Sequence, residues 1–277
     1  MIKLITDSAS QIPADLAARL DVAVVPVVVT VDGVDYREGV DIHADEFWDR
    51  CVDGLPDVVT SQPSPGDIAA VYARAVADGA AEIVSVHVGA EHSGTLNSAR
   101  LAAAEVDVPV HLVDSGTASF GVTCCVWEAA AAVAAGSTGE EVADRARATA
   151  PTIGTTFIIQ ALDFARRGGR LAEHLPEDHE GVMVLGGVGG AIDLLSTGHT
   201  VDELCDQMVA PFLAEGRPIR AGVSLADSAT AVFTDGIEAR LRDSEIDVDL
   251  VRYRVGPSIA AHTGPGTAGG FWYPISE

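Results

Sequence analysis

The sequence predicts an α/β fold built as two α/β domains. The first is a Rossmann-like domain with a parallel sheet over residues 1–150, and the second is a smaller α/β domain over residues 151–277. Two observations support this. Short β-branched runs alternate with alanine-rich segments of helical spacing, which is the pattern of a doubly wound sheet. A polar stretch at residues 137–154 separates two such series, and a chain of 277 residues is long enough for two domains.

The first series starts at the N-terminus and alternates strands with helices. The run at residues 22–31 is continuously apolar, which favours one strand buried on both faces. Ser64, Pro65 and Asp67 have the spacing of a capped helix start, so a helix begins at Pro65. The full prediction is strands at residues 2–7, 22–31, 82–88 and 108–115, and helices at residues 12–20, 93–106, 120–136 and from 65 onward.

The second series repeats the alternation after residue 154. Gly168 and Gly169 are expected to end a helix. The glycine-rich run at residues 181–191 supplies GxG but not the third glycine of a dinucleotide loop, so close packing or a flexible turn is favoured. The full prediction is strands at residues 155–160, 219–226 and 248–256, and helices at residues 161–170, 200–215 and 229–244.

Charge and composition exclude several classes of protein. The net charge is −24, and Lys3 is the single lysine, so a nucleic-acid partner is not expected. Apolar runs are interrupted before ~18 residues, so no transmembrane helix is expected. The N-terminus lacks the pattern of a signal peptide, and we expect a cytoplasmic protein. The four cysteines form no CxxC pair and favour buried, reduced thiols.

Three loops with small hydroxyl residues follow strands or precede helices. They are Thr60-Ser61-Gln62-Pro63, Ser93-Gly94-Thr95 and Asp114-Ser115-Gly116. In an open parallel sheet, ligands bind beyond the carboxyl ends of the strands, where helix N-termini offer N–H groups to an anion. We therefore expect the three loops at one sheet edge to hold a carboxylate or phosphate. Ordinary helix capping is the alternative for each loop taken singly.

Other reactive residues suggest weaker hypotheses. Ser93 could be a nucleophile, although Glu91 stands where a GxSxG elbow requires glycine. His174 and His179 lie in an acidic segment whose Pro176 breaks the helix that a zinc motif would need, so no metal site is expected. His262 beside Thr263, and Arg170 after a glycine pair, can donate hydrogen bonds to an anion.

Taken together, five stretches of the chain resemble the DegV family. They are TSQPSPGD at residue 60, HSGTLNSA at 92, VDSGTAS at 113, FARRGGRL at 164 and AHTGPG at 261. The resemblance covers nearly the whole chain. It implies two α/β domains, an apolar tunnel, and a long-chain fatty acid whose carboxylate lies at the interdomain cleft. It also implies a protein that is not itself an enzyme and that presents the acid to a separate fatty acid kinase.

The same resemblance assigns roles to individual residues. Ser93 would donate its hydroxyl to the carboxylate, and Thr60 and Ser61 would supply hydroxyl or N–H groups. His262 would approach from the second domain, and Arg170 would complete the charged end. Further candidates are Gly94, Thr95, Ser115 and Thr263. No cofactor is implied, because ATP and Mg²⁺ would belong to the kinase.

The chain departs from the family pattern at residues 175–200, which are glycine-rich, acidic and without the basic run that members often carry. Two alternatives to fatty acid binding also stay open. The first is a Ser93-dependent hydrolase or acyltransferase. The second is a protein that binds another anionic, amphiphilic metabolite.

Overall fold

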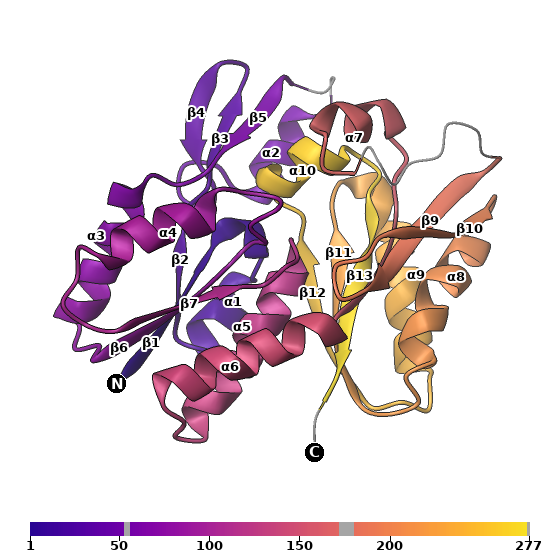
Figure 1. The fold of residues 1–277 in the computed structure, drawn as a ribbon. Coiled ribbons are helices and arrows are strands. Elements are labelled where there is room, and N and C mark those ends of the chain that lie inside the picture. Colours follow the sequence, from indigo (N-terminus) through magenta and orange to yellow (C-terminus); the bar gives the residue numbers. More distant parts are fainter. Residues whose placement is uncertain (53–55, 172–179, 276–277) are drawn as a thin grey trace. The chain divides into compact units, whose positions relative to one another are not determined.

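The computed structural model describes residues 1–52, 56–171 and 180–275. The chain forms two compact units (Figure 1). Unit 1 comprises residues 1–43 and 56–151, and unit 2 comprises residues 44–55 and 152–277. The second unit is thus about as long as the first, and it includes a segment that interrupts the first in sequence. The acidic segment with His174 and His179 lies outside the described residues.

Unit 1 contains a parallel sheet of four strands in the order β2-β1-β6-β7. The chain leaves β1 toward β2 on one side and later returns to β6 on the other. The order of the strands therefore reverses between β1 and β6, which is where open α/β sheets bind ligands, beyond the carboxyl ends. The strands are β1 (Ile2–Asp7), β2 (Val22–Val25), β6 (Glu82–His87) and β7 (Val110–Asp114).

Helices cover both faces of this sheet. In Figure 1, α3 lies beside α4, and α5 lies beside α6. Ile5 and Ile83 face α3 and α4, where Ile68 and Tyr72 complete a buried cluster. Ser64 and Asp67 form a reciprocal capping box, which confirms the helix start predicted at Pro65. The helical elements are η1 (Ser8–Ser10), α1 (Ala14–Arg19), α3 (Pro65–Ala77), α4 (Thr95–Ala103), α5 (Phe120–Ala134) and α6 (Gly139–Thr149).

The apolar run at residues 22–31 forms two strands, so the prediction of one strand was wrong. Pro26 lies between β2 and β3, and a proline lacks the N–H that a continuous central strand would need. The second half joins an antiparallel sheet of order β4-β3-β5. Asp32 and Gly33 have positive φ values of 49° and 80°, which suit a tight hairpin turn. The strands are β3 (Val28–Val31), β4 (Val34–Arg37) and β5 (Val58–Ser61).

Unit 2 contains a mixed sheet of order β10-β9-β8-β13-β11-β12, in which the neighbours β11 and β12 pair in parallel and the other neighbouring strands pair antiparallel. The glycine-rich run forms β9 and the turn to β10. Close packing is confirmed there, because an added Cβ on Gly186 or Gly187 would lie 2.3 Å from a backbone oxygen. The strands are β8 (Gly154–Ile158), β9 (Val182–Val188), β10 (Asp193–Gly198), β11 (Ile219–Leu225), β12 (Val248–Arg254) and β13 (Ala268–Pro274).

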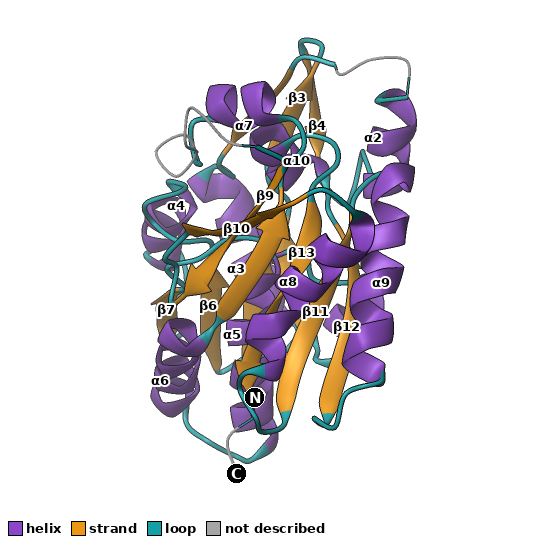
Figure 2. Ribbon diagram, turned by 90° about the vertical axis from the view of Figure 1, so that its right-hand side faces the viewer, coloured by secondary structure: helices purple, strands orange, loops and turns teal. Residues whose placement is uncertain are grey.

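The helices of unit 2 bury both faces of its sheet. Figure 2 shows α8 and α9 in front of β11 and β12, where Phe212 stacks on Trp272 with ring centroids 4.2 Å apart. On the opposite face, Ala165 of α7 packs with Met183 and Leu185. The helical elements are α2 (Ala44–Arg50), η2 (Ala150–Thr152), α7 (Leu162–Gly168), α8 (Val201–Leu213), η4 (Ser228–Thr230), α9 (Ala231–Arg242) and α10 (Pro257–Thr263).

Helix α2 joins unit 2 through two contacts with the end of β12. The indole Nε1 of Trp48 donates to the carbonyl of Val255 at 2.7 Å, and Arg254 pairs with Asp45 at 2.6 Å. No helix in the described ranges is both long enough and apolar enough to cross a bilayer.

Candidate ligand-binding site

Ser93 lies at the end of the loop that joins β6 to α4. Its Oγ lies 2.9 Å from Oγ1 of Thr95 and accepts the backbone N–H of Thr95 at 3.3 Å. Thr95 is fully buried, whereas Ser93 is partly exposed. Among the described residues, we find no acceptor for the backbone N–H groups of Gly94 and Leu96. The helix therefore begins with two hydroxyls and two N–H donors, a set that suits an anion.

Gly94 allows the β5–α3 loop to approach this helix start. A Cβ on Gly94 would lie 1.8 Å from Oε1 of Gln62, whose Nε2 donates to Oγ of Ser98 at 3.2 Å. The Gln62 side chain thus lies against the Gly94 backbone and connects two of the three hydroxyl loops. The loops are evident from the sequence, but no local pattern there points to this role of Gln62.

Thr60 and Ser61 differ from the expectation that all three loops share one edge of the parallel sheet. Both belong to β5 of the separate antiparallel sheet, where Thr60 pairs with Val29 and Ser61 with Val28. Successive side chains of a strand point to opposite faces. Thr60 is accordingly half-buried on the face of buried Val29, and Ser61 is exposed on the other face. The two hydroxyls cannot act together on one atom from the same face.

The Asp114-Ser115-Gly116 loop supports the Ser93 loop. Oδ1 of Asp114 accepts the N–H groups of Ala90 and Gly116 at 3.1 and 3.0 Å. The buried Ser115 hydroxyl donates to the carbonyl of Thr117 and accepts its N–H, so its hydrogen-bonding capacity is used within its own turn. Ser115 is therefore a structural neighbour of Ser93 rather than an open donor.

A buried polar chain below these loops was not anticipated from the sequence. Nδ1 of His87 lies 2.9 Å from Oδ2 of Asp7, and Nε2 lies 2.8 Å from Oγ of Ser85. All three residues have 0% exposure. Asp7 and His87 end neighbouring parallel strands, so a signal existed in their positions after two apolar runs. Their pairing across eighty residues could be known only from the strand order.

The arrangement Asp7–His87–Ser85 has the residue types of a hydrolase triad, but its serine is not accessible to a substrate. Ser85 is inside β6 and fully buried, so no substrate can reach its hydroxyl. Ser93, which is partly exposed, has atoms of Thr95 as its hydrogen-bond partners within the described chain. These contacts give Ser93 no general base, which weighs against the hydrolase alternative.

The thiols are also poorly suited to nucleophilic chemistry. Cys124 and Cys125 are buried on α5 and Cys205 on α8, as the sequence analysis expected for cysteines without a CxxC motif. Burial raises the pKa of Cys125 to about 12 and that of the half-buried Cys51 to about 11. In the described part of the chain, no group of three or more His, Cys, Asp or Glu side chains could hold a metal ion.

The second-unit candidates lie on two neighbouring elements. His262 and Thr263 end α10, and Arg170 follows α7 after Gly169, which has a φ of 73°. Helices α7 and α10 pack side by side in Figures 1 and 2. His262 is partly exposed and Arg170 is exposed, while Thr263 is nearly buried with Oγ1 3.4 Å from the carbonyl of Ile259.

The loop after His262 is fixed by two glycines and one carboxylate. A Cβ on Gly264 would lie 2.9 Å from Ala161, and one on Gly266 would lie 2.8 Å from Gln160. Oδ2 of Asp227 accepts the N–H of Gly266 at 2.7 Å. The HTGPG segment therefore holds α10 close to the start of α7, which brings together the elements that carry His262 and Arg170.

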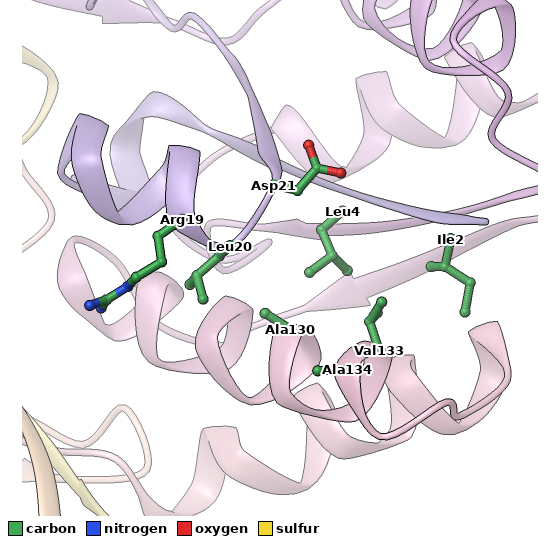
Figure 3. Close-up of a pocket in the computed structure, with 8 residues that line it drawn as sticks. All are labelled: Ile2, Leu4, Arg19, Leu20, Asp21, Ala130, Val133 and Ala134. Atoms are coloured by element: carbon green, nitrogen blue, oxygen red, sulfur yellow. The ribbon is translucent and has the colours of Figure 1, made fainter.

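A small pocket lies away from these loops, at the other end of the parallel sheet in unit 1 (Figure 3). Figure 3 shows Leu4 and Leu20 facing Ala130 and Val133 across it. Its volume is about 230 Å³, whereas ligand pockets usually measure ~300–1,000 Å³. Since Ile2 at the amino end of β1 lines it, the pocket is separate from the hydroxyl loops.

Comparison with known proteins places this arrangement in a family. A sequence model described as an uncharacterised protein of the DegV family matches residues 1–275. A DegV domain-containing protein of Streptomyces coelicolor is 33% identical over 277 residues, covering 97% of this chain and 96% of its own. One of Deinococcus radiodurans is 31% identical, covering 99% of both chains.

Solved structures give the same result. A DegV family protein from Thermus thermophilus, described by its fatty acid binding, is 32% identical, with a TM-score of 0.85 over 99% of both chains. A stearic acid-binding protein from Eubacterium ventriosum is 25% identical, with a TM-score of 0.86 over 99% of this chain and 98% of the other. These matches extend over the whole α/β architecture described above and confirm the resemblance noted in the sequence: the chain belongs to the DegV family.

Proposed function

We propose that this protein binds a long-chain fatty acid and that the hydroxyl group at the start of α4 receives its carboxylate. One observation carries the proposal. Ser93 and Thr95 offer adjacent hydroxyls 2.9 Å apart at a helix N-terminus, in a chain that matches a fatty acid-binding protein over 99% of its length.

The head group can be satisfied by neutral donors. The Ser93 hydroxyl can rotate from Thr95 toward a carboxylate oxygen, since either atom of that pair can be the donor. The N–H groups of Gly94 and Leu96 add two donors at the positive end of the helix dipole. An unpaired carboxylate would be costly to bury, so the function of these donors is to offset that cost.

The acyl chain supplies most of the affinity. Each buried CH₂ contributes about 0.8 kcal/mol, so a chain of ~16 carbons gains on the order of 10 kcal/mol. That exceeds what a few neutral hydrogen bonds contribute, at about 0.5–1.5 kcal/mol each. Affinity is therefore expected to depend on the length of the acyl chain. Specificity for an acid rather than an alcohol or ester is expected to depend on Ser93 and its neighbours.

The proposal extends to the other candidates and to a partner. Thr60, His262 and Arg170 are expected to contribute to head-group binding, with Ser61, Ser115 and Thr263 in weaker supporting roles. The bound acid is expected to be presented, in the cytoplasm, to a separate fatty acid kinase that brings ATP and Mg²⁺. The protein itself is not an enzyme in this scheme.

Native mass spectrometry of the freshly purified chain tests the proposal, followed by extraction of any bound molecule. We expect a stoichiometric adduct with the mass of a C14–C18 fatty acid, and weaker retention in Ser93→Ala. Ser228→Ala is a matched control, because it removes an exposed hydroxyl from η4 in unit 2. A protein that stays free of ligand after fatty acid is added would refute the proposal.

The two alternatives give different results in the same preparation. Covalent labelling of Ser93 by a fluorophosphonate would favour the hydrolase. Retention of short anions regardless of tail length would favour a binder of another anionic metabolite.

A further inference from the structure

Asp7 and His87 form a fully buried pair where the strand order of the parallel sheet reverses. Asp7 is the last residue of β1 and His87 the last of β6. The Asp7 carboxylate accepts three N–H groups: Oδ2 from His87 Nδ1 at 2.9 Å and from the Val88 backbone at 3.1 Å, and Oδ1 from the Ala9 backbone at 3.1 Å. One carboxylate thus fixes the first residues beyond two neighbouring strands.

A short series of backbone contacts connects this carboxylate to Ser93. Val88 precedes Gly89, whose carbonyl accepts the N–H groups of His92 and Ser93 at 2.9 and 3.2 Å. The N–H of Gly89 donates to Thr117 at 2.7 Å, and a Cβ on Gly89 would lie 3.0 Å from the Thr117 nitrogen. The carbonyl of His87 also accepts the N–H of Ser115 at 3.2 Å. The path of the Ser93 loop is therefore fixed at Gly89, the residue after Val88, whose N–H group the Asp7 carboxylate accepts.

We propose that Asp7 and His87 are positioning residues, which hold the Ser93 loop in the conformation that receives a carboxylate. Neither side chain touches the ligand in this scheme, because both have 0% exposure. The inference rests on the proposed function, since it gives the pair a purpose in binding. It goes further by assigning part of the head-group affinity to residues that the ligand does not contact.

The chemistry of the pair determines which variants are informative. A carboxylate only accepts hydrogen bonds, so Nδ1 of His87 carries a hydrogen and donates it to Asp7. Asparagine at position 7 keeps one acceptor oxygen but replaces the other with an NH₂ group. That NH₂ group cannot accept a hydrogen bond from the N–H donors it would face. Asp7→Asn therefore nearly preserves volume while opposing the contacts that fix Val88 or Ala9.

The experiment compares Asp7→Asn with Glu128→Gln in the full chain. Glu128 is also a buried carboxylate of unit 1, with 4% exposure, but it accepts from Arg145 at 2.8 Å and lies on α5 away from the site loops. Displacement of a fluorescent fatty acid measures affinity. We expect Asp7→Asn to weaken binding about tenfold and Glu128→Gln less than about twofold, because only the first shares a network with Ser93.

A double-mutant cycle separates positioning from general destabilisation. In a Ser93→Ala background, Asp7→Asn should weaken binding by less than about twofold, because the hydroxyl it positions is gone. Equal losses in both backgrounds would overturn the proposal, as would unchanged affinity of Asp7→Asn. If Asp7→Asn does not fold, His87→Leu and His87→Asn replace it. The asparagine, whose amide can occupy the place of Nδ1, should restore binding that leucine loses.

A second readout does not depend on ligand binding. Hydrogen exchange at the Ser93 amide should accelerate in Asp7→Asn and not in Glu128→Gln, and the strongly downfield Nδ1–H resonance of His87 should be lost only in Asp7→Asn. If the wild type binds no fatty acid, the proposed function fails, and these signals still test the pair. If the wild type binds but exchange at Ser93 is unchanged, the positioning role fails alone.

Discussion

Replacing Gly94 by alanine tests whether the packing of Gln62 shapes the start of α4. The new Cβ would lie 1.8 Å from Oε1 and 2.7 Å from Cδ of Gln62, so the two side chains cannot coexist as they are. Gln62 is exposed and can rotate away. The backbone of Gly94 has a φ of −75°, which alanine adopts readily. The cost therefore arises from moving Gln62, not from backbone strain.

The contacts that are lost set the magnitude. Rotating Gln62 breaks its 3.2 Å hydrogen bond to the buried Ser98, and such a bond contributes about 0.5–1.5 kcal/mol. Alanine in place of glycine also lowers the conformational entropy of the unfolded chain, which stabilises the folded protein by about 0.4–1 kcal/mol. Because α4 begins here, alanine is also a poorer residue than glycine before the first turn. We expect a net destabilisation of about 1 kcal/mol.

Urea unfolding of a double-mutant cycle isolates the steric cost. In a Gln62→Ala background, the Cβ that Gly94→Ala introduces has room, and the bond to Ser98 is already absent. The destabilisation by Gly94→Ala should therefore fall by about 1 kcal/mol in that background. The same free-energy change in both backgrounds would show that Gln62 does not constrain Gly94.

Four further predictions concern other parts of the molecule. Asp227→Ala should destabilise unit 2 by about 2 kcal/mol, because the backbone N–H groups of Ala229 and Gly266 lose their carboxylate acceptor, and it should speed hydrogen exchange at Gly266; an unchanged Gly266 amide would contradict this. Trp48→Phe should lower the free energy of unfolding in urea by about 1 kcal/mol, because it removes the hydrogen bond to Val255. An unchanged free energy of unfolding would show that this bond of α2 contributes little to stability. Burial raises the pKa of Cys51 from 9.0 to about 11, so at pH 8 its thiolate fraction should be about a hundredfold lower than in the unfolded chain; fast labelling by Ellman's reagent at pH 8 would disprove this. Raising salt from low ionic strength should tighten fatty acid binding, because the net charge of −24 repels the carboxylate, and weakening by salt would point to a site dominated by cations.

Local signals in the sequence predicted the elements better than their partners. The capping box at Ser64 and the glycine stop at Gly169 are each determined by a few adjacent residues, and both are confirmed. The break at Pro26 was also readable, because proline removes an N–H from a strand. So was the hairpin at Asp32 and Gly33, a favoured turn pair. The prediction of one strand rested on the continuous apolar character of residues 22–31 and used neither signal.

The arrangement of the site depends on contacts that no local pattern contains. Thr60 and Ser61 follow an apolar run like Ser93 does, yet they lie in a different sheet. The alternation of side chains along a strand could have shown that these two hydroxyls face opposite ways. By contrast, the packing of residues 44–55 with unit 2 and the pairing of Asp7 with His87 arise from segments far apart in sequence. Strand order reveals the pairing of Asp7 with His87, and the packing of α2 against the end of β12 reveals the other contact.

The acidity of the chain and the chemistry of the Ser93 loop are compatible for a physical reason. With 41 acidic and 17 basic residues, the surface repels an anion at long range, but at physiological ionic strength this field decays over about 8 Å. Within hydrogen-bond distance, the nearby donors determine whether an anion binds. At the start of α4 these are hydroxyls and backbone N–H groups, which carry no full charge that neighbouring carboxylates could capture. A lysine or arginine in the same place would have many acidic competitors, as the ion pairs of Arg240 with Asp202 and Asp206 illustrate. Neutral donors at a helix N-terminus therefore remain available to a ligand carboxylate in a protein whose arginines are largely occupied by its own acids.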